Sequence, residues 1–212
     1  MSGNGVCWGP LQPFERLTDE QKRAGIARAL AERPAGEPFR VFAFGSLMWN
    51  PEVSVAATYT ATVHGYRRRF QIWSTRARGC PEAPGLGLCL VAEEGSCPGL
   101  ILELDEATLD EDLKRLWDRE QASGVYRPAW VDTEGFLGPV RALTFIAREE
   151  HPHFVPPLPR EQMAEIMCKA AGRYGTNRDY LVRLLETMHE LGIEDPDLKD
   201  LDACIRARAE GA

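Results

Sequence analysis

The chain has 212 residues, of which 44% are apolar and 27% are charged, the balance of an ordinary globular protein. Its formal net charge is -7 and it has no long Lys/Arg block, so we expect no nucleic-acid partner. Nothing approaches about 20 consecutive apolar residues, so we also expect no membrane span.

The six cysteines indicate the compartment in which the protein works. No two of them form a CxxC pair, and their wide spacings fit no zinc pattern. We therefore expect scattered thiols in a reducing environment. The segment 1–17 lacks the basic start and the apolar run of a secretory signal, and the predicted location is the cytoplasm.

The first predicted element is a helix that comes after this Gly- and Pro-punctuated segment. Thr18 and Gln21 have the spacing of a capping box, and the helix is expected to run to about residue 32, before Pro34. Ile26 and Leu30 give it only a thin apolar stripe, which is typical of a peripheral helix. We therefore interpret residues 1–36 as an N-terminal extension, and residues 37–212 as one domain.

A β-rich body comes next. Segments that mix alternating and continuous apolar patterns are expected to form strands over 39–44, 60–74 (bent at Gly65), 86–92, 99–105, 126–133 and 140–148. A helix over 108–122 should interrupt them, since Thr108 and Glu111 form a second capping-box pattern and Gly124 suits the C′ position. After the Pro-rich segment 151–160, further helices are expected over 161–172, 177–192 and 195–210. This layout indicates an α+β fold with a helical C-terminal part.

The stretch "VFAFGSLMWNP" contains the first candidate for chemistry. Apolar residues run directly into Gly45 and Ser46, and Leu47 is apolar again. A buried strand that ends in this way can bend sharply and leave backbone N–H groups pointing outward, where they bind a carbonyl oxygen, a carboxylate or a phosphate. An ordinary tight turn, with Ser46 capping the next few residues, explains the same sequence.

The second candidate is a carboxylate on the apolar face of the helix over 108–122. Leu109, Leu113, Leu116 and Trp117 form a stripe at helical spacing, and the next position on it is Glu120. Burial and the negative end of the helix dipole both predict a raised pKa for Glu120, which suits a general base. The alternative is a Glu at the helix end that reaches solvent or pairs with a nearby arginine.

Other candidates carry less information. His151 and His153 could contact a metal, but no third ligand is spaced to join them, so a loop is the better interpretation. The glycines in "GLGLCL" precede a strand where a dinucleotide site needs a helix. Tyr180 flanks an apolar helical stripe, where core packing and a substrate contact explain it equally well.

Five short motifs occur in an order that resembles the ChaC-type gamma-glutamylcyclotransferases. They are "FGSLMWNP", "GYRRRF", "RG…PG" (residues 78–79 and 84–85), "LWDRE…SGVYRPAW" and "GTNRDYL", and they span about residues 39–207. The resemblance implies a small mixed β-barrel with packed helices. It also implies cleavage of glutathione to 5-oxoproline and cysteinylglycine without metal or nucleotide, and we expect no cofactor.

The resemblance also implies roles for individual residues. Glu120 matches the catalytic glutamate of the family, and Gly45, Ser46 and Leu47 match the turn whose backbone holds the gamma-glutamyl group. Tyr180 matches a motif tyrosine. Two further residues fall on positions that line the pocket, namely Arg78 and Tyr126.

Two positions depart from the family pattern and leave the substrate open. Phe44 stands where the family usually has Tyr, and Leu86 stands where Arg is common after Pro-Gly. The lost hydroxyl and the lost charge keep two alternatives open. One is a cyclotransferase for other gamma-glutamyl peptides or amines, and the other is a non-catalytic gamma-glutamyl-binding regulatory protein.

Overall fold

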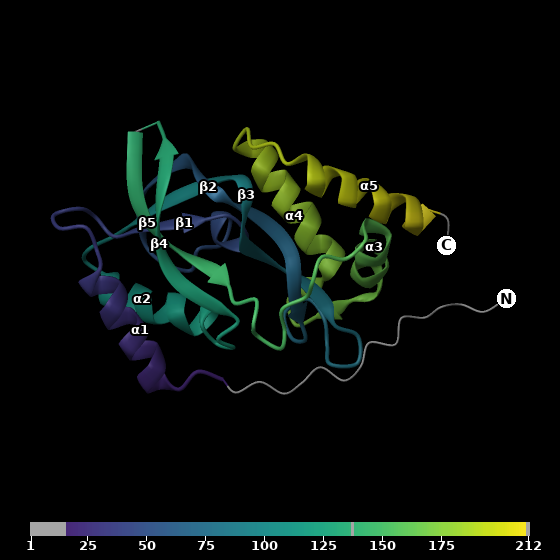
Figure 1. The fold of residues 1–212 in the computed structure, drawn as a ribbon, viewed down its shortest axis with the longest axis horizontal. Helices are drawn as coiled ribbons and strands as arrows, with labels where there is room; N and C mark the ends of the chain where they lie inside the picture. The colour runs from purple at the N-terminus through teal and green to yellow at the C-terminus, as the bar shows by residue number, and fades with distance from the viewer. Residues whose placement is uncertain (1–15, 137, 211–212) are drawn as a thin grey trace.

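Five strands close into a mixed β-barrel at the centre of the molecule (Figure 1), in the order β1-β3-β2-β4-β5. The computed structural model describes residues 16–136 and 138–210. The strands are β1 (Arg40–Ala43), β2 (Val55–Ser74), β3 (Gly85–Leu104), β4 (Tyr126–Gly135) and β5 (Gly138–Ala147). Most neighbours are antiparallel, but β5 pairs in parallel with β1, through Leu143 and Val41, and with β3. The predicted α+β fold with a small mixed barrel is confirmed.

The helices gather in two groups on opposite sides of the barrel (Figure 1). They are α1 (Asp19–Ala31), α2 (Leu109–Glu120), α3 (Arg160–Lys169), α4 (Asn177–Glu190) and α5 (Pro196–Glu210). The pair α1 and α2 lies on one side, and α3, α4 and α5 lie on the other. Within the described residues, none of these helices combines the length and the apolar character that crossing a membrane requires.

A long hairpin of β2 and β3 joins the two groups. The predicted bend at Gly65 is confirmed, because this residue has φ +77 and the pairing with β3 shifts register there. The prediction of two strands over 86–92 and 99–105 is wrong. They form one strand, β3, because β2 pairs with its residues on both sides of a bulge around Gly95. The polar sequence of that bulge hides the continuity of the strand.

The helix termini agree with the predicted caps in part. Thr18 and Gln21 form the expected capping box, and Thr176 forms another with Asp179 at the start of α4. The box predicted at Thr108 is wrong. The Thr108 hydroxyl instead donates to the buried carboxylate of Asp112, 2.7 Å away, and this carboxylate also accepts from the Ser54 backbone.

The other end of α2 also differs from the prediction. The helix ends at Glu120 with Gln121 as its C-cap, so Gly124 is not at C′, although its φ of +71 is left-handed. The helix predicted over 161–172 likewise ends early, at Lys169. The residues after it form a short hairpin of β6 (Ala171–Gly172) and β7 (Gly175–Thr176).

The helix α1 of the predicted extension packs against the rest of the chain. Lys22 pairs with Asp118 of α2 at 2.7 Å, and the Trp130 indole of β4 donates to the Ala29 carbonyl at 3.2 Å. Only Ala29 of this helix is fully buried, as the thin apolar stripe predicts. The division of the chain at residue 36 stays a prediction.

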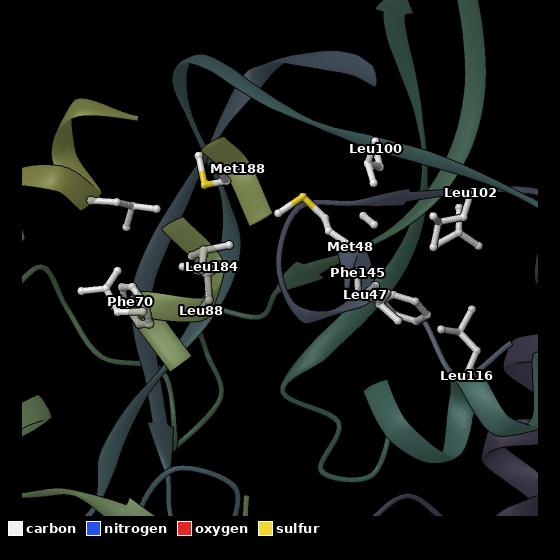
Figure 2. Close-up of a cluster of buried hydrophobic side chains, with 14 of the residues drawn as sticks. Leu47, Met48, Phe70, Leu88, Leu100, Leu102, Leu116, Phe145, Leu184 and Met188 are labelled. Carbon is white, nitrogen blue, oxygen red and sulfur yellow. The ribbon is translucent and has the colours of Figure 1, made fainter. Parts of the chain in front are cut away.

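One apolar core runs from the barrel to α4. Figure 2 shows Leu47 and Met48 beside Phe145 of β5, and Leu88 of β3 beside Leu184 of α4. Leu47 and Met48 belong to the single turn η1 (Ser46–Met48) that comes after β1, and both are 8% exposed. Their burial anchors this turn to the core.

Candidate active site

A cavity of about 780 Å³ opens between the end of β1, the β2–β3 hairpin, the end of α2 and the start of α4. Its wall is formed by segments far apart in the sequence. All eight residues that the sequence predicts for the site line this cavity, namely Phe44, Gly45, Ser46, Leu47, Arg78, Glu120, Tyr126 and Tyr180. Its volume lies within the range of about 300–1,000 Å³ typical of small-molecule sites.

The turn after β1 has the form that its sequence predicts. Gly45 departs from strand geometry with ψ -135, and its carbonyl accepts from the Met48 N–H at 2.9 Å to close η1. The Ser46 backbone and side chain lie close enough to the Tyr180 phenol to lower its pKa. Within residues 16–136 and 138–210, the Leu47 N–H has no acceptor. A ligand oxygen can fill this role, since a backbone donor left unpaired inside a protein is costly.

Glu120 is the last residue of α2, and its side chain is 19% exposed. Burial raises its pKa above the ordinary value, as predicted; the adjacent Arg119 lowers it and the Glu52 carboxylate raises it further. The Arg119 Nε lies 3.0 Å from the Glu120 Oε1. Glu120 therefore lines the cavity and also pairs with an arginine, as the alternative interpretation predicts, while its role as a general base stays a prediction.

Two tyrosines face this carboxylate. Burial and the Glu120 charge together raise the pKa of Tyr180 to about 12, although hydrogen bonding from Ser46 and the Arg78 charge oppose the rise. Burial also raises the pKa of Tyr126 well above its usual range. The Tyr126 hydroxyl donates to the Leu88 carbonyl at 3.0 Å. Both phenols are therefore neutral near pH 7.

Arg78 lies in the loop between β2 and β3, with its guanidinium carbon 5.2 Å from the centre of the Tyr180 ring. It also donates to the Thr176 carbonyl at 3.3 Å. In the part of the chain that the structure describes, no carboxylate lies within ion-pair distance of Arg78. Its positive charge is thus available to an anionic ligand in the cavity.

The two positions that depart from the family pattern have different surroundings. Phe44 is half-buried, and its carbonyl accepts from the buried Arg68 at 3.0 Å. Leu86 is fully buried, and its N–H and carbonyl are both bound by the Asn177 side chain, at 2.5 and 2.9 Å. Asn177 is itself fully buried at the start of α4, three residues before Tyr180.

The sequence reasoning missed several cavity residues, and three of them contact the predicted site residues or complete the wall. Trp49 packs edge-on against Tyr180, with ring centres 5.5 Å apart, and Trp73 forms another part of the wall. Arg119 appeared only as a possible ion-pair partner, yet it contacts Glu120, Ser46 and the Asn50 carbonyl. Its position directly before Glu120 is a signal in the sequence, but the contact with Ser46 depends on the fold.

No metal centre is formed by the described residues, since no group of three or more His, Cys, Asp or Glu is placed to hold an ion. His151 and His153 lie in the loop before α3, with ring centres 5.7 Å apart. His151 contacts the Ser123 carbonyl through Nε2 at 3.1 Å. These contacts give the two histidines a structural role in that loop.

Comparisons with known proteins agree with this geometry. A family model described as ChaC-like protein matches residues 39–208. The chain is 37% identical over 197 residues to a glutathione-specific gamma-glutamylcyclotransferase of Escherichia coli (strain K12), covering 92% of this chain and 85% of the relative. It is 32% identical over 173 residues to the glutathione-specific gamma-glutamylcyclotransferase 1 of Danio rerio, covering 79% of this chain and 88% of that one.

The fold has a close counterpart among solved structures. The crystal structure of a gamma-glutamyl cyclotransferase specific to glutathione from yeast matches with a TM-score of 0.75 at 19% identity, covering 81% of this chain and 97% of that one. The family model spans most of the chain, and the resemblance that the five motifs predict is confirmed. The chain therefore belongs to the family of ChaC-like proteins.

Proposed function

We propose that this chain is a gamma-glutamylcyclotransferase that cleaves glutathione into 5-oxoproline and cysteinylglycine. One observation carries the proposal: Glu120 and the Gly45–Leu47 turn, a carboxylate and a set of backbone donors, line the same cavity. The relatives named as glutathione-specific cyclotransferases support the same reaction. A cavity of about 780 Å³ is large enough for a tripeptide.

The substrate supplies its own nucleophile in this reaction. Its α-amine attacks its own γ-carbonyl carbon, a carbon–nitrogen bond closes the five-membered lactam, and the bond to the cysteine nitrogen breaks. The protein has to hold the flexible gamma-glutamyl chain in the conformation that brings amine and carbonyl together. Such orientation supplies several kcal/mol of a barrier, up to roughly 10 kcal/mol in well-oriented systems.

Glu120 is the proposed general base. The α-ammonium group of the substrate loses two protons in all, and the amine of cysteinylglycine gains two, so the reaction is balanced in protons. Glu120 takes one proton from the ammonium group and gives it to the departing nitrogen. Its pKa, raised by burial, suits both transfers because the carboxylate must accept the proton and then release it.

The turn after β1 is the proposed binding site for the γ-carbonyl oxygen. This oxygen gains negative charge in the tetrahedral intermediate, and in this proposal the Leu47 N–H and Ser46, which line the cavity, donate to it. Tyr126 and Tyr180 remain neutral and shape the wall beside Glu120. Arg78 supplies a positive charge for a substrate carboxylate.

The test is release of 5-oxoproline from glutathione by the purified protein and by Glu120→Gln. We expect release by the parent, and a rate at least about 100-fold lower in the variant, since general base catalysis contributes about 10²–10⁴-fold. The matched control is Glu111→Gln on an exposed turn of the same helix, which should keep the parent rate. Comparable rates for Glu120→Gln and the parent would contradict the assignment.

A second candidate is turnover of other gamma-glutamyl peptides or amines. Phe44 and Leu86 favour it, because a hydroxyl and a charge are missing at positions that line the cavity. A panel of glutathione, gamma-glutamylcysteine and gamma-glutamyl amines separates the two, and the highest kcat/KM identifies the substrate. Binding of glutathione without release of 5-oxoproline from any of them would favour the regulatory alternative.

The proposal includes action in the cytoplasm on a small molecule, without a nucleic-acid partner. The cysteines that the structure describes are free thiols, and Cys89 and Cys97 are fully buried. Free thiols are typical of reducing compartments. Fractionation of the source cells, and then detection of the protein in the soluble fraction, tests this location.

A further inference from the structure

The guanidinium of Arg119 contacts the base and the oxygen-binding turn at the same time. Its Nε lies 3.0 Å from the Glu120 Oε1, and its Nη2 donates to the Ser46 Oγ at 2.8 Å. Its Nη1 donates to the Asn50 carbonyl at 2.5 Å and lies 3.5 Å from the Glu52 carboxylate. One side chain therefore joins the end of α2 to the start of η1 and to the segment that follows η1.

This arrangement is not the usual one for neighbours on a helix. Successive residues point about 100° apart, so adjacent side chains do not face each other. Arg119 reaches Glu120 with its Nε because Ser46 and Asn50 bind the other two guanidinium nitrogens, Nη2 and Nη1. Arg119 and Glu120 are each 19% exposed, which favours a fixed geometry over a mobile surface pair.

The contact also determines what the Ser46 hydroxyl can do. A hydroxyl has one proton to donate, and the Ser46 Oγ already accepts from Arg119. Its proton is therefore directed away from Arg119 and is available to another acceptor at the cavity wall, such as a ligand oxygen. Arg119 in this way orients both a hydrogen-bond donor, the Ser46 hydroxyl, and a hydrogen-bond acceptor, the Glu120 carboxylate.

We infer that Arg119 is a positioning residue. It fixes the Glu120 carboxylate and the Ser46 hydroxyl relative to each other, and thereby aligns the groups that act on the amine and on the γ-carbonyl oxygen of the substrate. This inference rests on the proposed function, and it gives that reaction a further residue. Lysine cannot replace Arg119 fully, because an ammonium group lacks the planar fork that reaches three partners.

The charges around Glu120 predict how its titration responds. Arg119 on α2 lowers its pKa and Glu52 from the loop after η1 raises it, while Tyr126 and Tyr180 face it as neutral phenols. Once the Arg119 charge is removed, nothing among these groups opposes the rise in the Glu120 pKa that burial and the Glu52 charge cause. The pKa of Glu120 should then rise, and the acidic limb of kcat/KM should move to higher pH.

The experiment compares Arg119→Gln and Arg119→Lys with the parent, using pH profiles of kcat and KM for glutathione. Arg119→Gln should lower kcat about 100-fold, the loss that a misplaced group of about 1 Å brings, and move the acidic limb upward. Arg119→Lys should keep the limb near that of the parent, because its charge remains, but should still lower kcat about tenfold or more. The matched control is Lys114→Gln, which removes a charge at an exposed position of α2 outside the cavity lining and should match the parent.

Two outcomes would overturn the inference. In one, both Arg119 variants keep the parent's kcat and acidic limb. In the other, both lose activity only in proportion to their unfolded fraction, measured by thermal unfolding, which marks a merely structural role. If Arg119→Gln does not fold, Arg119→Lys alone tests the inference. The expected result is then a lowered kcat with an acidic limb of the pH profile that matches the parent.

A substrate-free measurement separates this inference from the proposed function. Carbon-13 NMR titration of the glutamate carboxyls, with Glu120 assigned through Glu120→Gln, reports the Glu120 pKa directly. We expect a higher value in Arg119→Gln than in the parent and a near-parent value in Arg119→Lys. A parent that does not release 5-oxoproline contradicts the proposed function, whereas an unchanged Glu120 titration in Arg119→Gln contradicts the role of Arg119.

Discussion

The phenol oxygen of Tyr180 lies 3.0 Å from the point where a β-carbon on residue 45 would stand, and Leu88 lies 3.1 Å from the same point. Close approach therefore favours glycine at position 45, since a β-carbon there would press against both neighbours. The absence of a side chain at position 45 lets the backbone turn and the tyrosine of α4 lie this close together. This contact brings the first and the last motif of the sequence into one wall.

Gly45→Ala should therefore disturb the site more than the fold. A methyl group there forces Tyr180 or η1 to move by a few tenths of an ångström, and we expect kcat/KM for glutathione to fall at least about tenfold. Combining Gly45→Ala with Tyr180→Phe removes the oxygen that clashes, so the two losses should be less than additive. Steady-state kinetics of both single variants and the double variant measures the coupling, and strictly additive losses would contradict the contact.

The pH dependence of kcat/KM should reflect the buried base. Glu120 must be deprotonated to accept a proton, so activity should rise with pH through its pKa, which lies above 4.5. Tyr180 has a pKa of about 12 and should add no alkaline limb below about pH 10. A profile from pH 4 to pH 10 tests both points, and an acidic limb at or below 4.5 would contradict the burial of Glu120.

The two tyrosines should respond differently to loss of their hydroxyls. Tyr126→Phe removes the bond to the Leu88 carbonyl, and the free energy of unfolding should fall by about 1 kcal/mol. Tyr180→Phe should cost less stability, because its partner Ser46 keeps the bond from Arg119, but it should lower kcat. Urea unfolding and steady-state kinetics of both variants check this, and equal stability losses would argue against the distinction.

Asn177 offers a test of how α4 is attached to the barrel. Asn177→Asp keeps an acceptor for the Leu86 N–H but loses the donor to its carbonyl, and buries a charge. At pH 7 it should destabilise the protein by roughly 3 kcal/mol, and more than Asn177→Ala does.

The pH dependence of this variant has a definite sign. Burial raises the folded-state pKa of the new carboxyl above its unfolded value, so its stability relative to the parent is greatest at acid pH and is lost as pH rises. Protonated Asp can also donate to the Leu86 carbonyl. Unfolding of Asn177→Asp and the parent at pH 4 and pH 7 measures the difference, and a loss that is larger at pH 4 would contradict the burial.

The sequence predicts elements whose causes are local. The apolar stripe of α2 leads from Leu109 to Glu120, and the spacing alone places this carboxylate on the buried face. Thr18 and Gln21 are three residues apart, so their capping box can be predicted from the sequence. The positive φ that Gly65 tolerates marks the bend of β2 in the same way.

Features with distant causes could not be predicted in this way. Thr108 fails as a capping residue because Asp112 is buried against Ser54, a neighbour more than 50 positions earlier. The continuity of β3 depends on its partner β2, since the residues around Gly95 have no strand pattern of their own. The hydrogen bond from Arg119 to the Ser46 hydroxyl joins residues 73 positions apart, and no pattern in the sequence indicates it.

The pairing of β1 has a consequence for the way the protein is made. Val41 pairs with Leu102 of β3 and with Leu143 of β5. The partners of β1 therefore lie about 60 and 100 positions later in the sequence. Contacts between such distant segments slow folding. During synthesis the apolar strand β1 leaves the ribosome long before β5 exists to cover it, and nascent chains shorter than about 150 residues should bind chaperones and resist folding.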